Sequence, residues 1–132
     1  MRAGTLALLL LASACSHAPT TPSAPIGTPF RIGIGQSVRL ESAGIELGFD
    51  EVLEDSRCPA DVVCVWAGTA RLKAWVRATG TERRELELKT FPRQPLRVDA
   101  FEIDVQALEP FPYSNVRIDK RGYVATLVVT RR

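Results

Sequence analysis

The sequence predicts an all-β domain: a β-sandwich or small barrel of about seven antiparallel strands with one disulfide. Apolar and polar residues alternate with a period of two in several segments, and short turn-forming stretches separate those segments. No ten-residue window has a persuasive helical period, although a short helix near residues 60–63 stays open. The expected domain, residues 30–132, has a usual size for a single core.

The clearest alternation runs from Cys64 to Val76. A strand with this pattern has one face in the core and one face toward water. The apolar face comprises Cys64, Trp66, Ala70, Leu72, Ala74 and Val76, and the other face comprises Thr69, Arg71, Lys73, Trp75 and Arg77. We therefore expect Trp66 in the core and Trp75 on the outer face.

A β-hairpin is predicted to follow this strand. Its loop is Thr79–Thr81, with Gly80 in the left-handed conformation, and its second strand lies within residues 82–90. The register that follows pairs Trp75 with Glu85 and Lys73 with Glu87. Opposite charges that face each other across two strands stabilise a sheet modestly.

Shorter alternating segments predict the remaining strands. They are expected at 30–34, 38–40, 45–52, 101–107 and 123–129. The apolar positions change parity between Phe49 and Val52, which predicts a bulge or a strand end at that point.

The first 14 residues have the features of a signal peptide that is removed before folding. Arg2 is followed by an apolar run too short to span a bilayer, and Ala12-Ser13-Ala14 precedes Cys15. A cysteine placed in this way is the lipidation site of bacterial lipoproteins, and Ser16 after it fits the pattern sorted to the outer membrane. We expect an outer-membrane lipoprotein facing the periplasm; a secreted protein is the alternative if Cys15 is not lipidated.

Residues 15–29 are expected to form the lipidated cysteine and a proline-rich tether. Four prolines lie between residues 16 and 29, and they favour an extended polyproline-like chain that would reach roughly 40 Å. Lipidation uses one of the three cysteines. Cys58 and Cys64 can then pair in an oxidising compartment.

Composition argues against several classes of function. Without the leader, which contains only Arg2 as a charged residue, the chain has 16 basic and 15 acidic residues, so nothing suggests nucleic-acid binding. The single histidine, His17, lies in the expected tether. The sequence has no Gly-x-Ser-x-Gly motif, glycine-rich phosphate loop or metal-ligand cluster, and we expect neither a cofactor nor a catalytic site.

The distinctive stretch is Asp55–Gly68, which reads DSRCPADVVCVWAG. It resembles a motif of small uncharacterised bacterial lipoproteins: Asp-Ser-Arg-Cys-Pro, four residues, then Cys-x-Trp-x-Gly. The resemblance implies the fold and the localisation, and it brings no established activity with it.

Physical interpretation of this motif is mainly structural. A Cys58–Cys64 disulfide would stabilise the fold by roughly 2 kcal/mol and place Trp66 in the core beside it. Gly68 would permit a close approach of two chain segments or a bulge. Asp55 and Ser56 can cap the turn through side-chain to backbone hydrogen bonds.

Candidate binding residues are Asp55, Arg57, Asp61 and Trp75. The simplest interpretation of the acidic residues in this region is a solvated loop surface, because they lack the spacing of a calcium loop. These residues are Asp50, Glu51, Glu54, Asp55 and Asp61. The two cysteines have no further zinc ligands nearby. Trp75 is either a contact point for a sugar or protein, or a side chain covered by an arginine stem or a second sheet.

Three hypotheses of function follow. The first is a lipid-anchored envelope protein whose β-domain is not catalytic and acts by binding or structural contact, with the membrane and an envelope protein as partners. The alternative is a secreted inhibitor or ligand-binding module that uses the Cys58–Cys64 loop. The third is an envelope enzyme that depends on Asp55 and Asp61.

Overall fold

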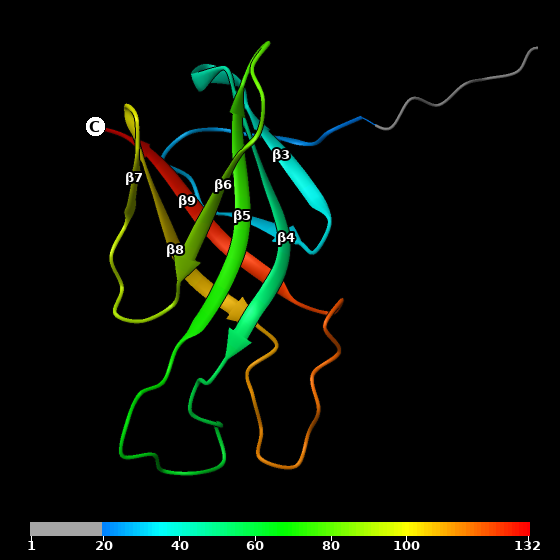
Figure 1. Ribbon diagram of the computed structural model, residues 1–132, viewed down its shortest axis with the longest axis vertical. Helices are drawn as coiled ribbons and strands as arrows, with labels where there is room; N and C mark the ends of the chain where they lie inside the picture. Colours follow the sequence, from blue (N-terminus) through cyan, green and yellow to red (C-terminus); the bar gives the residue numbers. More distant parts are fainter. Residues whose placement is uncertain (1–19) are drawn as a thin grey trace, which may run out of the picture.

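Two facing β-sheets form the part of the chain that the computed structural model describes, residues 20–132 (Figure 1). The strands are β1 (Ser23–Ala24), β2 (Phe30–Gly33), β3 (Gln36–Leu40), β4 (Ile45–Asp55), β5 (Ala70–Ala78), β6 (Arg84–Lys89), β7 (Leu96–Val98), β8 (Phe101–Glu109) and β9 (Val124–Arg131), with one 3-10 turn, η1 (Glu41–Ala43). One sheet has the order β1-β3-β4-β5-β6 and the other β2-β9-β8-β7. The predicted all-β fold is confirmed, as a sandwich of open sheets.

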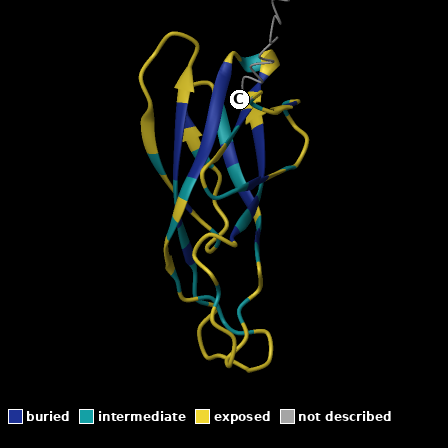
Figure 2. Cartoon of the chain, turned by 90° about the vertical axis from the view of Figure 1, so that its right-hand side faces the viewer, coloured by how far each residue is buried: buried dark blue, intermediate teal, exposed yellow. Residues whose placement is uncertain are grey.

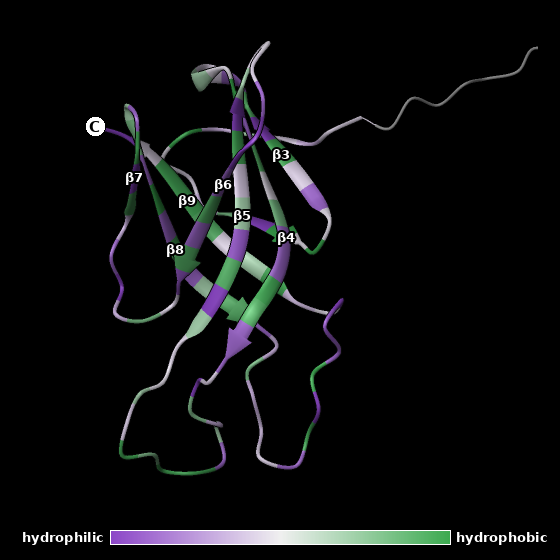
Figure 3. Ribbon diagram, in the orientation of Figure 1, coloured by the Kyte–Doolittle hydropathy of each residue, from purple (hydrophilic) through white to green (hydrophobic). Residues whose placement is uncertain are grey.

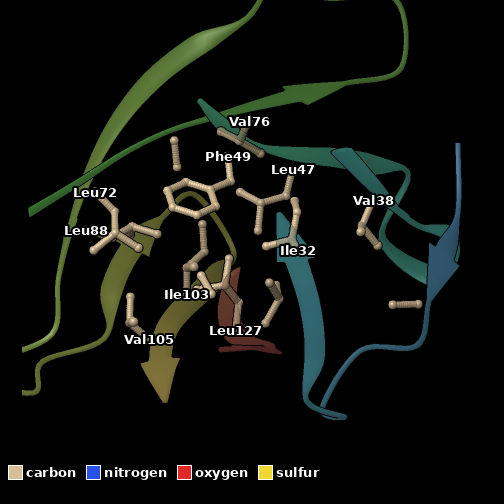
Figure 4. Close-up of a cluster of buried hydrophobic side chains, with 14 of the residues drawn as sticks. Ile32, Val38, Leu47, Phe49, Leu72, Val76, Leu88, Ile103, Val105 and Leu127 are labelled. Atoms are coloured by element: carbon tan, nitrogen blue, oxygen red, sulfur yellow. The ribbon is translucent and has the colours of Figure 1, made fainter. Parts of the chain in front are cut away.

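The core lies between the two sheets and takes alternate residues from each. Its largest fully buried side chains include Phe49 and Leu72 from one sheet and Ile103 and Leu127 from the other (Figure 4). Burying a side chain of this kind contributes roughly 1.5–3 kcal/mol. The central strands are accordingly buried along most of their length, while the long connections at one end are exposed (Figure 2).

The predicted hairpin between β5 and β6 is confirmed. Trp75 lies opposite Glu85, Lys73 lies opposite Glu87, and Gly80 has a φ of +79°. The start of β5 was predicted wrongly, however. The strand begins at Ala70, and residues 64–69 belong to a loop. The apolar–polar alternation that begins at Cys64 therefore does not correspond to a strand over residues 64–69.

Bulges in two strands change which residues face the core. In β4 the pairing register shifts between Phe49 and Glu51 and again between Val52 and Glu54, which confirms the predicted irregularity. In β8 the register shifts between Val105 and Ala107. Leu108 is consequently the buried residue, although Ala107 is the one that shares the parity of Ile103 and Val105.

Part of the predicted tether belongs to the sandwich. Ser23–Ala24 pairs in parallel with β3, Ala24 is buried, and the Arg39 amide donates to the Pro22 carbonyl oxygen over 2.8 Å. The amide of Gly27 donates to the carbonyl oxygen of Val129. The expectation of a free proline-rich chain up to Pro29 is therefore wrong for residues 22–27. Prolines flank the two paired residues, which is compatible with an edge strand.

The predicted signal peptide, residues 1–14, and the predicted lipidation site Cys15 lie outside the described residues. Within residues 20–132, no helix has the length and apolar character needed to cross a membrane.

Candidate functional site

Two long loops extend from the same end of the sandwich and lie against each other (Figures 1 and 2). Residues 56–69 connect β4 to β5, and residues 110–123 connect β8 to β9; we call them together the two-loop end. The amide of Ala60 donates to the Pro112 carbonyl oxygen over 2.8 Å. The amide of Ser114 donates to the Asp61 carboxylate over 2.9 Å, and the Ser114 hydroxyl donates to its other oxygen. Each loop therefore braces the other.

The Cys58–Cys64 disulfide is confirmed, with a Cα–Cα distance of 5.9 Å. It closes the outer part of the 56–69 loop. Inside the closed segment the Val62 amide donates to the Pro59 carbonyl oxygen over 3.3 Å, and the Cys58 amide bonds across the loop to the Ala67 carbonyl oxygen. The segment is thus held in one conformation without a regular strand or helix.

Ser56 and Gly68 bring the two stems of this loop together. The Ser56 hydroxyl donates to the Thr69 carbonyl oxygen over 2.8 Å and accepts a bond from the Thr69 amide. Gly68 has a φ of +67°, and a Cβ atom there would stand 1.8 Å from the Ser56 carbonyl oxygen. Only glycine fits this conformation and this gap, which confirms the predicted close approach.

A largely buried ion pair joins the bases of both loops. Arg57 makes a bidentate contact with Asp55, at 2.7 and 2.8 Å, and the two side chains are only 12% and 11% exposed. The same guanidinium donates to the carbonyl oxygens of Leu108 and Pro110, at 2.6 and 2.9 Å. Tyr123 donates its hydroxyl to Asp55 over 3.0 Å. The sequence places Arg57 among the candidate binding residues; in the structure its guanidinium lies inside the base of both loops.

Protonation of this network follows from its contacts. Burial alone would raise the pKa of Asp55, but the hydrogen bonds and charge of Arg57, with the Tyr123 hydroxyl, outweigh it and lower the pKa. Burial, together with the hydrogen bond to Asp55, raises the pKa of Tyr123 to about 12. The network is therefore an ionised carboxylate held by a guanidinium and a neutral phenol.

Beyond this network, the loop ends expose large apolar side chains. They are Val63, Val65, Trp66, Phe111, Tyr113 and Val116, which we call the apolar tip. Trp66 is 83% exposed, so the prediction that it fills the core is wrong. The physical reason is that β5 starts only at Ala70 and the backbone turns at Gly68, so the parity of the strand does not extend to residue 66. Figure 3 shows hydrophobic colour in these outlying loops.

Trp75 lies on the outer face of its sheet but is only 4% exposed. Its ring occupies the space above Gly48, where a Cβ atom would come within 2.1 Å of it, and its indole N–H donates to Asp50 over 3.1 Å. The Arg83 guanidinium lies 4.0 Å and that of Arg77 5.5 Å from the ring centroid. The arginine-covered interpretation is confirmed, and Trp75 is removed from the candidate binding residues.

The predicted acidic patch separates into individual contacts. Asp50 accepts from Trp75, Asp55 is bound by Arg57 and Asp61 by Ser114, and Glu54 pairs with Arg71 at 3.3 Å. Among residues 20–132, no group of three or more His, Cys, Asp or Glu side chains is placed to hold a metal ion. Of the four predicted binding residues, Asp55 and Arg57 support the loops from inside, and Asp61 links them.

Sequence reasoning missed the aromatic residues of the second loop, Phe111 and Tyr113. Their local signal is that large apolar residues stand beside Pro110 and Pro112, outside any alternating segment. Fold and site together define a β-sandwich protein with a braced, apolar two-loop end. Comparisons of the chain with protein-family models, with curated proteins and with solved structures find no match.

Proposed function

We propose that this chain is a lipid-anchored protein of the bacterial cell envelope whose β-sandwich has a binding role, without catalysis, through the two-loop end. Cys15 at the end of a short apolar leader supports the anchor. An outer-membrane location facing the periplasm agrees with Ser16 and with a disulfide, which needs an oxidising compartment.

The observation that carries the binding role is the exposure of the apolar tip on a rigid support. Soluble domains seldom leave several large apolar side chains together in water without a use. A disulfide, a buried ion pair and hydrogen bonds between the loops hold these side chains in place before any contact is made. Such preorganisation reduces the ordering cost of binding, and tryptophan and tyrosine are the usual binding hot spots.

The anchor would keep this domain close to the membrane. The structure places residues 22–27 within the sandwich, so residues 16–21 alone separate the lipid from the domain. Six residues span about 20 Å at most, half of the distance expected from the sequence. The chain enters beside β3, away from the two-loop end, which leaves the apolar tip free for contact (Figure 1).

In-cell photo-crosslinking of the anchored chain tests the proposal. A photoreactive residue in place of Trp66 should give specific crosslinks in envelope fractions, whereas one in place of exposed Glu82, in the hairpin at the other end, should give none. Mass spectrometry of the membrane fraction should find a diacylglyceryl group on Cys15. Equal labelling from positions 66 and 82 would remove the binding role, and an unmodified Cys15 would remove the anchor.

The secreted inhibitor or ligand-binding module stays as the second candidate. It is favoured by Val63 and Val65, which project on either side of Cys64 from the closed loop. Alanine changes from Pro59 to Val63 should then abolish inhibition of a target enzyme while leaving the fold intact. If these changes leave every phenotype intact, this candidate is lost.

A further inference from the structure

We infer that the apolar tip docks on an anionic lipid surface, with its aromatic and valine side chains in the interfacial region and the basic residues of the second loop on the phosphate groups. The inference rests on the proposed envelope function and names the partner of the two-loop end.

The shape of the tip fits a surface better than a small ligand. Val63, Val65 and Trp66 project almost completely into solvent and line none of the main hollows of residues 20–132. One hollow of the described domain, of about 540 Å³, is at the opposite end, beside Gly44 and Gly80, and another of about 290 Å³ is next to Val76 and Val98. A third, of about 510 Å³, lies in the second loop and is lined by residues 117–121, none of which belongs to the apolar tip. Projecting side chains from two neighbouring loops can enter a soft interface together.

The residue types at the tip are those that favour the membrane interface. Trp66 and Tyr113 each combine an apolar ring with a polar group, and such side chains collect at the level of the headgroups. Phe111 and the valines supply apolar area. Because these loops are irregular, their backbone groups need water or partners, so insertion is confined to the interface and does not extend into the hydrocarbon.

Basic residues follow the tip along the second loop. A turn links Tyr113 and Val116, and Arg117, Lys120 and Arg121 come after it. All three are exposed, and none forms an ion pair with another residue of the described segment, 20–132. With Asp119 as the only acid between residues 110 and 122, this loop carries a net charge of +2. These cations lie between the tip residue Val116 and the start of β9, on the side of the loop that returns to the sandwich, where headgroup phosphates would meet them if the tip entered the interface.

The nearest acid of the first loop does not oppose this arrangement. Both carboxylate oxygens of Asp61 are bound by Ser114, so the group faces the other loop.

Vesicle binding tests the inference on the full chain with Cys15→Ser, exported so that the disulfide forms but no lipid is attached. The probes are vesicles of phosphatidylglycerol mixed with phosphatidylcholine, and vesicles of phosphatidylcholine alone. Binding should favour the anionic vesicles and fall as salt is added. The emission of Trp66 should shift to the blue, with quenching by shallow but not deep bromolipids, while Trp75 stays buried.

Matched variants locate the contact. Trp66→Ala should weaken sedimentation with anionic vesicles roughly tenfold or more, whereas Leu53→Ala, at an exposed apolar residue outside the tip, should not. Replacing Arg117, Lys120 or Arg121 by Gln should cost about fivefold each, because one cation near an anionic surface contributes about that factor. Arg97→Gln, at an exposed arginine on β7, is the control.

Absence of binding to anionic vesicles, or binding that Trp66→Ala leaves unchanged, would overturn the lipid inference. Crosslinks from position 66 to a protein would in that case keep the proposed binding role and identify a protein as its partner. If neither vesicles nor crosslinks are obtained, both the inference and the proposed binding role fail.

Discussion

The two tryptophans of this chain lie in contrasting environments: the ring of Trp75 is buried, and the ring of Trp66 is exposed to solvent. Trp75 lies on the outer face of a sheet and is still buried, because Gly48 leaves room beneath it and Arg83 covers it. Trp66 lies in a loop that is held by a disulfide and by backbone hydrogen bonds, yet its side chain is exposed to solvent. Burial of a side chain thus depends on the residues that neighbouring segments place around it. Alternation along a single strand predicts it poorly.

The two regions also divide stability from binding. The sheet around Trp75 buries apolar area and satisfies its indole N–H with Asp50. In the two-loop end the Asp55–Arg57 pair stabilises the base, the disulfide closes the outer part of the first loop, and the apolar side chains of the tip are exposed around it. Substitutions should therefore separate into those that unfold the domain and those that leave it folded but impair contact.

The largest expected difference is between alanine changes at the two tryptophans. Trp75→Ala removes a buried ring and leaves Gly48 beside a cavity, so it should lower the free energy of unfolding by about 3–5 kcal/mol. Trp66→Ala should change it by less than about 0.5 kcal/mol. Urea unfolding followed by circular dichroism measures both. Similar values for the two variants would contradict the comparison.

Next in size is the loss of the buried ion pair. Arg57→Ala leaves the Asp55 carboxylate buried without its cation and frees the carbonyl oxygens of Leu108 and Pro110, and it should cost about 3 kcal/mol. Arg71→Ala is the matched control, since Arg71 also contacts carboxylates, of Glu54 and Glu87, but at an exposed site. It should cost much less. An equal loss in the two variants would show that burial of Arg57 is energetically unimportant.

Local patterns were sufficient for much of the fold. The β5–β6 register, the bulge in β4, the disulfide and the tight place at Gly68 each depend on residues close in sequence. The position of Arg57 could not be predicted, because two of its partners are main-chain oxygens more than 50 residues away, which have no signature in the sequence. Trp66 was misplaced because a strand pattern was extended through a loop.

Removing the disulfide should have an intermediate effect. Cys58→Ser with Cys64→Ser frees a short loop in the unfolded chain and should cost roughly 2 kcal/mol. Since both cysteines lie outside the core, the emission of Trp75 should stay unchanged below the unfolding transition, whereas contacts made by the apolar tip should weaken. Loss of the native Trp75 signal without denaturant would show that the loop and the sheet are not independent.

The smallest expected effect is a loss of stability at high pH that originates in Tyr123. Its pKa is raised to about 12 in the folded chain, so folding favours the neutral phenol. The stabilisation is complete below pH 10, where an unfolded tyrosine is also neutral, and is lost as the pH rises toward 12. At pH 11 the loss should be about 1 kcal/mol.

Tyr123→Phe cannot ionise, so the stability difference between it and the parent chain should shrink from pH 9 to 11 as phenol ionisation destabilises the parent. A difference that stays constant over this range would place the hydroxyl in water and not on Asp55, and would weaken the view that the base of the two-loop end is a closed, dry support for the apolar tip.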